Sequence, residues 1–173
     1  MNKTEVRNSL KENTRKVLSV IQEFPETKFN TRPSEQEWSA GEVCEHLIKV
    51  ETSTVRLCTG KTESCSRDSE EEIPKLKSRL GDRNAKMRVF GPIIPDESPK
   101  NKIKVLEKLQ DIRQRLIGLI EVDELTELVL EFDHPLFGKL TRIEWIYFSI
   151  YHTQRHIYQI EEIAAEVSEN PTS

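Results

Sequence analysis

Hydrophobic residues recur at the spacing of an α-helix in four separate stretches, and this pattern constrains the fold more than any other feature of the chain. Charged residues fill the positions between them, so each stretch is expected to bury one face. The four stripes are Val6, Leu10, Val17, Ile21 and Phe24; Val43, Leu47, Val50 and Leu57; Leu106, Leu109, Leu116 and Ile120; and Trp145, His152, His156 and Ile163. Four helices with one apolar face each predict an all-α fold, a four-helix bundle.

Residues typical of helix ends bracket the four stretches. The tetrapeptides Ser39–Glu42 and Thr141–Glu144 match the capping box, in which the two outer residues satisfy each other's backbone N–H groups. Ser98 followed by Pro99 predicts the start of the third helix, because proline is favoured at the first helical position. The other expected ends lie near Pro25, Gly60 and Val167.

The connections are less regular than the helices. The segment 61–97 is polar and punctuated by glycine and proline, so we expect a loop or short-helix excursion there, with the helix at Glu70 to Leu80. Leu128–Phe132 fits a short extended segment. At 173 residues, one domain over 1–168 and a flexible tail over 169–173 are expected.

Charge and composition argue against several classes of function. The formal net charge is −4 with acids and bases interspersed, so nothing favours nucleic acid or an anionic membrane as a partner. The N-terminus lacks the apolar run of a signal peptide, and no segment approaches the roughly 20 apolar residues that span a bilayer. Cys44, Cys58 and Cys65 match neither a disulfide framework nor a Cys-x-x-Cys pair. The sequence therefore predicts a cytoplasmic protein with reduced thiols.

Three of the four histidines fall on predicted apolar faces. His152 and His156 are four residues apart and share one face of the fourth helix, while His46 lies on the stripe of the second. Buried imidazoles without partners are costly, and a shared cation removes that cost. Three nitrogen ligands leave an open coordination position, which is the layout of a catalytic metal site. We therefore predict that His46, His152 and His156 bind one divalent ion.

Plainer interpretations exist for each candidate residue. A helical His-x-x-x-His pair arises by chance, and a single inward histidine is more often a hydrogen-bonded core residue. Glu42 could act as a general base, although capping already explains it, and Gln159 could orient a ligand or lie at a polar edge. Cys44 is expected to be a core thiol, and His134, which precedes Pro135, a surface or turn-stabilising residue.

Aromatic and charged positions outside the histidine stripe suggest packing and solvation. Tyr147, Tyr151 and Tyr158 lie off that stripe, so we expect packing or a subunit contact there, and we predict a homodimer. The lysine and glutamate runs are interpreted as solvated helix faces.

Two segments carry the candidate ligands within a longer fingerprint. The first is Trp38-Ser39-Ala40-Gly41-Glu42-Val43 leading to His46-Leu47. The second is His134-Pro135-Leu136-Phe137-Gly138-Lys139-Leu140-Thr141, followed by Glu144-Trp145 and by His152-x-x-Arg155-His156-x-x-Gln159-Ile160. In order and separation these segments resemble DinB-like proteins. The helices between them match only in pattern, and the segment 61–97 matches no motif of that family.

The resemblance implies a four-helix bundle of up-down-down-up connectivity, a divalent ion held by His46, His152 and His156, and frequent dimerisation. The family includes S-transferases and isomerases that use bacterial low-molecular-weight thiols, proteins described as metal-dependent hydrolases, and many of no known activity. An open-site Zn²⁺ or Ni²⁺ could lower the pKa of a thiol or of water.

We therefore expect a thiol S-transferase that uses a low-molecular-weight thiol as co-substrate and acts on a small-molecule substrate. A metal-dependent hydrolase and a non-enzymatic, stress-associated metal-binding protein are the alternatives.

Overall fold

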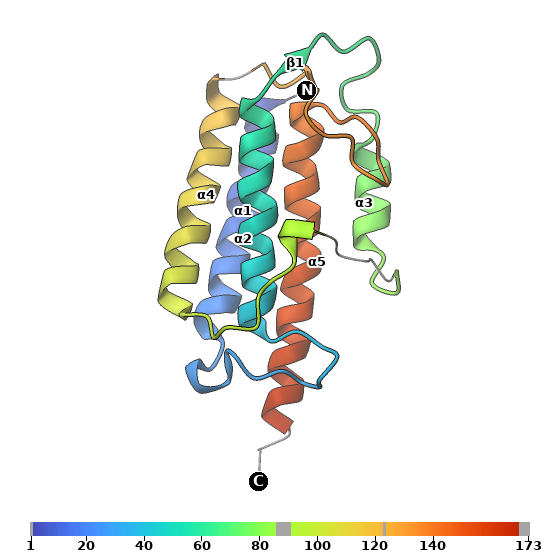
Figure 1. The fold of residues 1–173 in the computed structure, drawn as a ribbon. Coiled ribbons are helices and arrows are strands. Elements are labelled where there is room, and N and C mark those ends of the chain that lie inside the picture. The colour runs from blue at the N-terminus through green and yellow to red at the C-terminus, as the bar shows by residue number, and fades with distance from the viewer. Residues whose placement is uncertain (1, 86–90, 123, 170–173) are drawn as a thin grey trace.

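The computed structural model describes residues 2–85, 91–122 and 124–169, and four long helices dominate it (Figure 1). They are α1 (Lys3–Glu23), α2 (Ala40–Thr59), α4 (Lys102–Val122) and α5 (Arg142–Glu169). The smaller elements are η1 (Glu26–Lys28), β1 (Thr62–Glu63), α3 (Ile73–Gly81), η2 (Gly91–Ile93) and β2 (Leu128–Val129). The all-α four-helix bundle predicted from the sequence is confirmed.

The helices are connected in an order that differs from a simple up-and-down bundle. α1 and α2 each pack mainly against α4 and α5, which places α1 and α2 at opposite corners. Figure 1 shows α1 and α5 running in one direction and α2 and α4 in the other. This is the up-down-down-up connectivity that the resemblance implied. It leaves α2 and α5, the two helices that carry the candidate ligands, as antiparallel neighbours.

Both capping boxes are present. At the start of α2, the hydroxyl of Ser39 accepts from the backbone N–H of Glu42 at 3.2 Å, and the carboxylate of Glu42 accepts from the backbone N–H of Ser39 at 2.8 Å. The start of α5 has the same pattern, with Thr141 and Glu144 joined by bonds of 2.8 and 3.3 Å. The sequence rule predicted these ends because a capping box is a local interaction.

The predicted start of the third helix was wrong. α4 begins at Lys102, and Asn101 caps it by accepting from the backbone N–H of Lys104 at 3.0 Å. The side chain of Asn30 accepts from the N–H of Lys100 at 2.7 Å and donates to its carbonyl at 3.0 Å. Ser98 instead bonds to Asp96. A distant side chain thus holds the backbone of Lys100, and the helix starts after it.

The segment 61–97 contains the expected short helix, because α3 packs along α5 on the outside of the bundle (Figure 1). The extended segment near Leu128 also exists: β1 and β2 pair antiparallel, with Thr62 opposite Val129 and Glu63 opposite Leu128. The predicted tail at 169–173 lies beyond the described residues, except for Glu169 at the end of α5. No helix in the described part of the chain is long and apolar enough to cross a membrane.

A polar layer crosses the middle of the bundle between two hydrophobic clusters. Its centre is Arg113 of α4, whose side chain is fully buried and donates to both carboxylate oxygens of Glu51 on α2. Arg113 also donates to Asn13 of α1 at 2.7 Å and to the hydroxyl of Thr153 on α5 at 2.5 Å. That hydroxyl in turn donates to Glu51 at 2.7 Å. Each of the four bundle helices therefore contributes one side chain to this layer.

Two charged residues outside the lysine and glutamate runs, Glu51 and Arg113, lie inside the bundle. Both side chains have a relative exposure of 0%. Arg113 lies on the predicted apolar stripe of its own helix, four residues after Leu109 and three before Leu116. A guanidinium can occupy this position because a carboxylate, an amide and a hydroxyl accept from it.

We predict that Glu51→Gln lowers the free energy of unfolding by about 3–5 kcal/mol, because it leaves the buried charge of Arg113 without a counter-charge. Urea denaturation followed by circular dichroism measures the change. Asp111→Asn is the matched control, since it breaks an exposed i,i+4 pair with Arg115 on the same helix. Equal effects of the two substitutions would contradict a structural role for the polar layer.

Candidate metal centre

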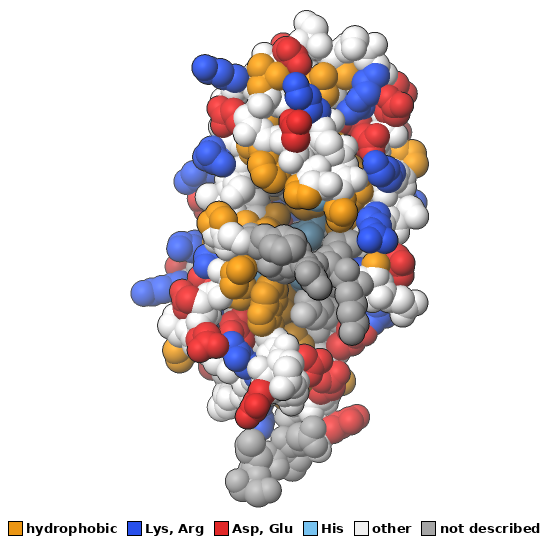
Figure 2. Space-filling view, turned by 45° about the vertical axis from the view of Figure 1, so that its right-hand side comes forward, with side chains coloured by type: hydrophobic (Ala, Val, Ile, Leu, Met, Phe, Trp, Pro, Cys, Tyr) orange, Lys and Arg blue, Asp and Glu red, His pale blue; other side chains and the backbone are white. Residues whose placement is uncertain are grey.

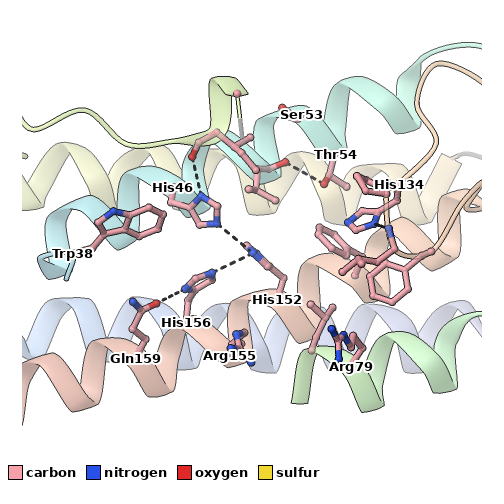
Figure 3. Close-up of a pocket in the computed structure, with 18 of the residues that line it drawn as sticks. Trp38, His46, Ser53, Thr54, Arg79, His134, His152, Arg155, His156 and Gln159 are labelled. Carbon is pink, nitrogen blue, oxygen red and sulfur yellow. Dashed lines mark hydrogen bonds between the residues drawn. The ribbon is translucent and has the colours of Figure 1, made fainter. Parts of the chain in front are cut away.

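The structure brings His46, His152 and His156 together at the face between α2 and α5 (Figure 3). All three side chains are buried, with relative exposures of 2%, 8% and 8%. The Nε2 of His152 lies 3.3 Å from the Nε2 of His46 and 3.2 Å from that of His156. One ligand nitrogen from each residue lies within 4.8 Å of the other two. The sequence prediction thus identified three side chains that meet at one point.

Hydrogen bonds on the opposite side of the rings fix two of the tautomers. The Nδ1 of His46 lies 2.8 Å from the carbonyl oxygen of Ile93 in η2, and the Nδ1 of His156 lies 2.7 Å from the Oε1 of Gln159. These oxygens can only accept, so both Nδ1 atoms carry the proton and both Nε2 atoms present a lone pair. Gln159, which the sequence left as an orienting or edge residue, orients His156.

The third imidazole, that of His152, cannot donate a hydrogen bond to both of the others. If the Nε2 of His152 carries a proton, this N–H can donate to the Nε2 of His46 or to that of His156, and the Nε2 lone pair of the other histidine is left without a donor. If it carries none, three lone pairs face one another. The Nδ1 of His152 is also buried and has no hydrogen-bond partner among the described residues. A cation shared by the three Nε2 atoms removes this repulsion.

The residues present fit such a cation. A tetrahedral ion with bonds of about 2.0–2.1 Å separates its nitrogen ligands by about 3.3–3.4 Å, close to the observed 3.3 and 3.2 Å. Burial lowers the pKa of His46 and His152, and it lowers that of His156 to about 3. The imidazoles are therefore neutral at pH 7, which is the form that binds metal. This site could hold one divalent metal ion.

The histidines form part of the wall of a cavity of about 1130 Å³. Aromatic side chains make up much of the remaining wall: Trp38, Phe132, Phe137, Trp145 and Phe148. Figure 2 shows a histidine side chain recessed among hydrophobic side chains on this face of the molecule. An ion at the three nitrogens would therefore face a space large enough for a small molecule.

The other predicted candidates have structural roles. Burial alone would raise the pKa of Glu42, but hydrogen bonds from Arg32 and Ser39 outweigh it and hold the pKa below its usual value. An ionised capping carboxylate that is already paired is a poor general base. Cys44 is fully buried as expected, and burial raises the pKa of its thiol. It is a core thiol, not a nucleophile.

The tyrosines have contacts within the chain. Tyr147 and Tyr151 are half-buried and stack on each other with ring centroids 5.8 Å apart. Tyr158 lines the cavity and lies under the guanidinium of Arg83.

Sequence reasoning did not place His134 at the cavity. His134 stabilises a turn, as expected, because its Nδ1 accepts from the backbone N–H of Leu136 at 3.1 Å. The same ring also lines the cavity that contains the three clustered histidines. Its position in the fingerprint segment, close in sequence to the aromatic residues Phe137 and Trp145, was the available signal. Only the folded chain shows that the turn lies against the cavity.

Two solved structures share this fold. The four-helix bundle protein TT2238 has a TM-score of 0.60 and 20% identity, with 93% of this chain and 99% of that chain covered. YfiT from Bacillus subtilis has a TM-score of 0.61 and 16% identity, with 96% and 87% covered. YfiT is described as a probable metal-dependent hydrolase with an unusual four-helix bundle topology. At these identities the two structures establish the fold alone.

The sequence comparisons define the family. The protein YuaE of Bacillus subtilis (strain 168) is 27% identical over 140 residues, which cover 81% of this chain and 85% of that protein. The sequence model of the DinB superfamily matches residues 9–160, a span that includes all of α2 and α4, most of α1 and α5, and the three clustered histidines. The chain is therefore a member of the DinB superfamily.

Proposed function

We propose that this protein is a metal-dependent enzyme in which His46, His152 and His156 hold one divalent ion, zinc or nickel, at their Nε2 atoms. The observation that carries the proposal is the convergence of three imidazole nitrogens on one point in a cavity wall. No fourth histidine, cysteine or carboxylate joins the cluster among the described residues. Three protein ligands leave a coordination position free for a substrate, as in catalytic sites.

When bound, the ion would lower the pKa of a thiol or of water at its free position and so supply a nucleophile at neutral pH. The chain's own groups would hold and shield that position. Ile93 and Gln159 fix the ring orientation of His46 and His156. The apolar walls would exclude bulk water and leave room for a small electrophile beside the nucleophile.

We favour thiol transfer over hydrolysis because of what surrounds the histidines. Within residues 2–85, 91–122 and 124–169, no carboxylate is hydrogen-bonded to any of the three imidazoles. Attack by water needs a group that accepts a second proton as the bond to the substrate forms, whereas a thiolate has none left to lose. A low-molecular-weight thiol as co-substrate is part of this proposal.

Metal-dependent hydrolysis is the alternative, and the description of YfiT is what supports it. In the third interpretation the protein is a non-enzymatic, stress-associated binding protein, and the ion only stabilises the core. A small-molecule substrate and a cytoplasmic location belong to the same proposal as the transferase.

We predict that His156→Ala abolishes stoichiometric metal binding and leaves the helical circular dichroism spectrum close to that of the native protein. Two imidazoles cannot hold the ion firmly, whereas the four hydrophobic stripes and the polar layer still stabilise the bundle. Metal content by mass spectrometry after dialysis measures the loss. Glu161→Ala, at an exposed position on the same helix, is the control and should bind one ion. An unfolded His156→Ala variant would instead indicate that the ion is structural.

We predict that the zinc- or nickel-loaded protein accelerates the addition of a small thiol to a small electrophile, and that His156→Ala abolishes this acceleration. The assay follows thiol consumption for a panel of thiols and electrophiles, with and without the metal. A parallel panel of esters and amides without thiol tests hydrolysis. Metal-dependent hydrolysis without thiol transfer would support the alternative, and no turnover in either panel would favour the binding protein.

The homodimer stays a prediction. Tyr147 and Tyr151, which suggested a subunit contact, are partly covered within the chain. Exposed apolar side chains elsewhere, including Ile103 at 64% and Leu136 at 47%, could still form such a contact. Multi-angle light scattering at micromolar concentration should give twice the mass of one chain, and a monomer mass would contradict the prediction.

A further inference from the structure

His134 lies in the wall of the same cavity as the three clustered histidines, but it belongs to a different part of the fold. It stands in the connection between β2 and α5, and Figure 3 shows it at one end of the cavity, with Trp38 and Gln159 at the other. The three clustered histidines lie between these ends. His134 is outside the group of nitrogens that could share one ion.

The turn around His134 determines which of its nitrogens carries the proton. Its Nδ1 accepts from the backbone N–H of Leu136 at 3.1 Å, so this nitrogen has a lone pair. The neutral ring therefore has its proton on Nε2. Within the described residues the Nε2–H has no hydrogen-bond partner, and it is not one of the fully buried polar atoms. It is a free donor at the cavity wall.

Aromatic packing holds this donor in place and in one protonation state. The His134 ring lies 4.7 Å from the ring of Phe137, 5.1 Å from that of Phe148 and 5.9 Å from that of Trp145, measured between centroids. Burial in this group lowers the pKa of His134 to about 4. At neutral pH the imidazole is uncharged, so it donates through its Nε2–H while Nδ1 keeps the lone pair that accepts from Leu136.

The donor is close enough to the metal centre to contact a molecule bound there. The ring of Phe148 is 5.1 Å from that of His134 and stacks on that of His152 at 5.3 Å, so both histidines contact the same aromatic ring. A small molecule with one end at the three Nε2 atoms could reach the Nε2–H of His134 with its other end.

The charge of the cavity wall indicates what kind of group would accept this hydrogen bond. Charged side chains of both signs line the cavity: Arg56, Arg79, Arg83, Arg155, Glu37, Glu162 and Glu166. Arg83 forms an ion pair with Glu162. Arg155 donates to the backbone carbonyls of Asp82 and Ala85, and neither Arg79 nor Arg155 forms an ion pair with a carboxylate within the described part of the chain. These two unpaired positive charges favour a negatively charged oxygen as the acceptor.

We propose that His134 contacts the substrate, and that its Nε2–H donates to a carboxylate or similar anionic oxygen of a molecule whose other end lies at the three-histidine site. The substrate class is then a small anion with an apolar segment, which fits between the aromatic side chains. This inference rests on the proposed function, because it needs a molecule bound at the metal.

Two substitutions at one position separate the donor from the turn. In His134→Asn, the side-chain oxygen can still accept from the N–H two residues later, as in an Asx turn, but the donor into the cavity is lost. In His134→Gln, the amide N–H₂ can reach the place of Nε2, but the turn acceptor is lost. If His134 served only the turn, the asparagine variant would behave like the native protein.

The test is calorimetric titration of the zinc-loaded protein with mercaptoalkanoates of three to six carbons, each compared with the alkanethiol of the same length. A thiol binds an open zinc site whether the natural nucleophile is a thiol or water. We expect at least one mercaptoalkanoate to bind about tenfold or more tightly than its alkanethiol. His134→Asn should remove this preference without changing alkanethiol affinity or the melting temperature, and His134→Gln should retain part of it.

Each other outcome has a distinct meaning. Alkanethiol binding with no preference for any mercaptoalkanoate, or a preference that survives in His134→Asn, would overturn the role of His134 and leave the metal site intact. If no thiol of either kind binds the zinc-loaded protein, the open metal site of the proposed function is wrong, and the inference about His134 is overturned with it.

Discussion

The buried ion pair between Arg113 and Glu51 is the interaction on which the arrangement of the bundle depends. Hydrophobic stripes specify the register of the helices less strictly, because apolar side chains of similar volume can replace one another in a core. A fully buried guanidinium is more demanding, since it must meet its acceptors at fixed geometry. Asn13 and Thr153 complete the set, so every bundle helix has to be in register for the charge to be satisfied.

The same register places the candidate metal ligands. Thr153 directly follows His152, and Glu51 lies five residues after His46. Side chains on the inner side of α2 and α5 therefore close the ion pair, while neighbouring side chains on the same two helices turn their imidazoles toward the cavity. The polar layer is satisfied on its inner side. On the cavity side of the same two helices, the three imidazoles present nitrogen lone pairs, and no group among the described residues donates to all of them. The polar layer and the candidate metal site therefore lie next to each other along α2 and α5.

The sequence was sufficient for what local rules and periodicity determine. The four stripes, both capping boxes and the inward direction of the three histidines each follow from residues within a few turns of one another. Arg113 on an apolar stripe was a visible anomaly, but no local pattern says that its partner is Glu51, 62 residues away in the sequence. The start of α4 was wrong for a similar reason, because the side chain of Asn30 holds Lys100 from 70 residues away. The position of His134 against the cavity depends on how the β2–α5 connection folds back over the helices.

X-ray absorption spectroscopy of the zinc-loaded protein tests the central claim most directly, because it reports the atoms bound to the ion whatever the reaction is. The account predicts three imidazole nitrogens at about 2.0–2.1 Å and one further light atom from solvent, with the imidazole signal lost in a variant that lacks the clustered histidines. A zinc–sulfur distance of about 2.3 Å to a protein cysteine, or an imidazole signal unchanged in that variant, would contradict it.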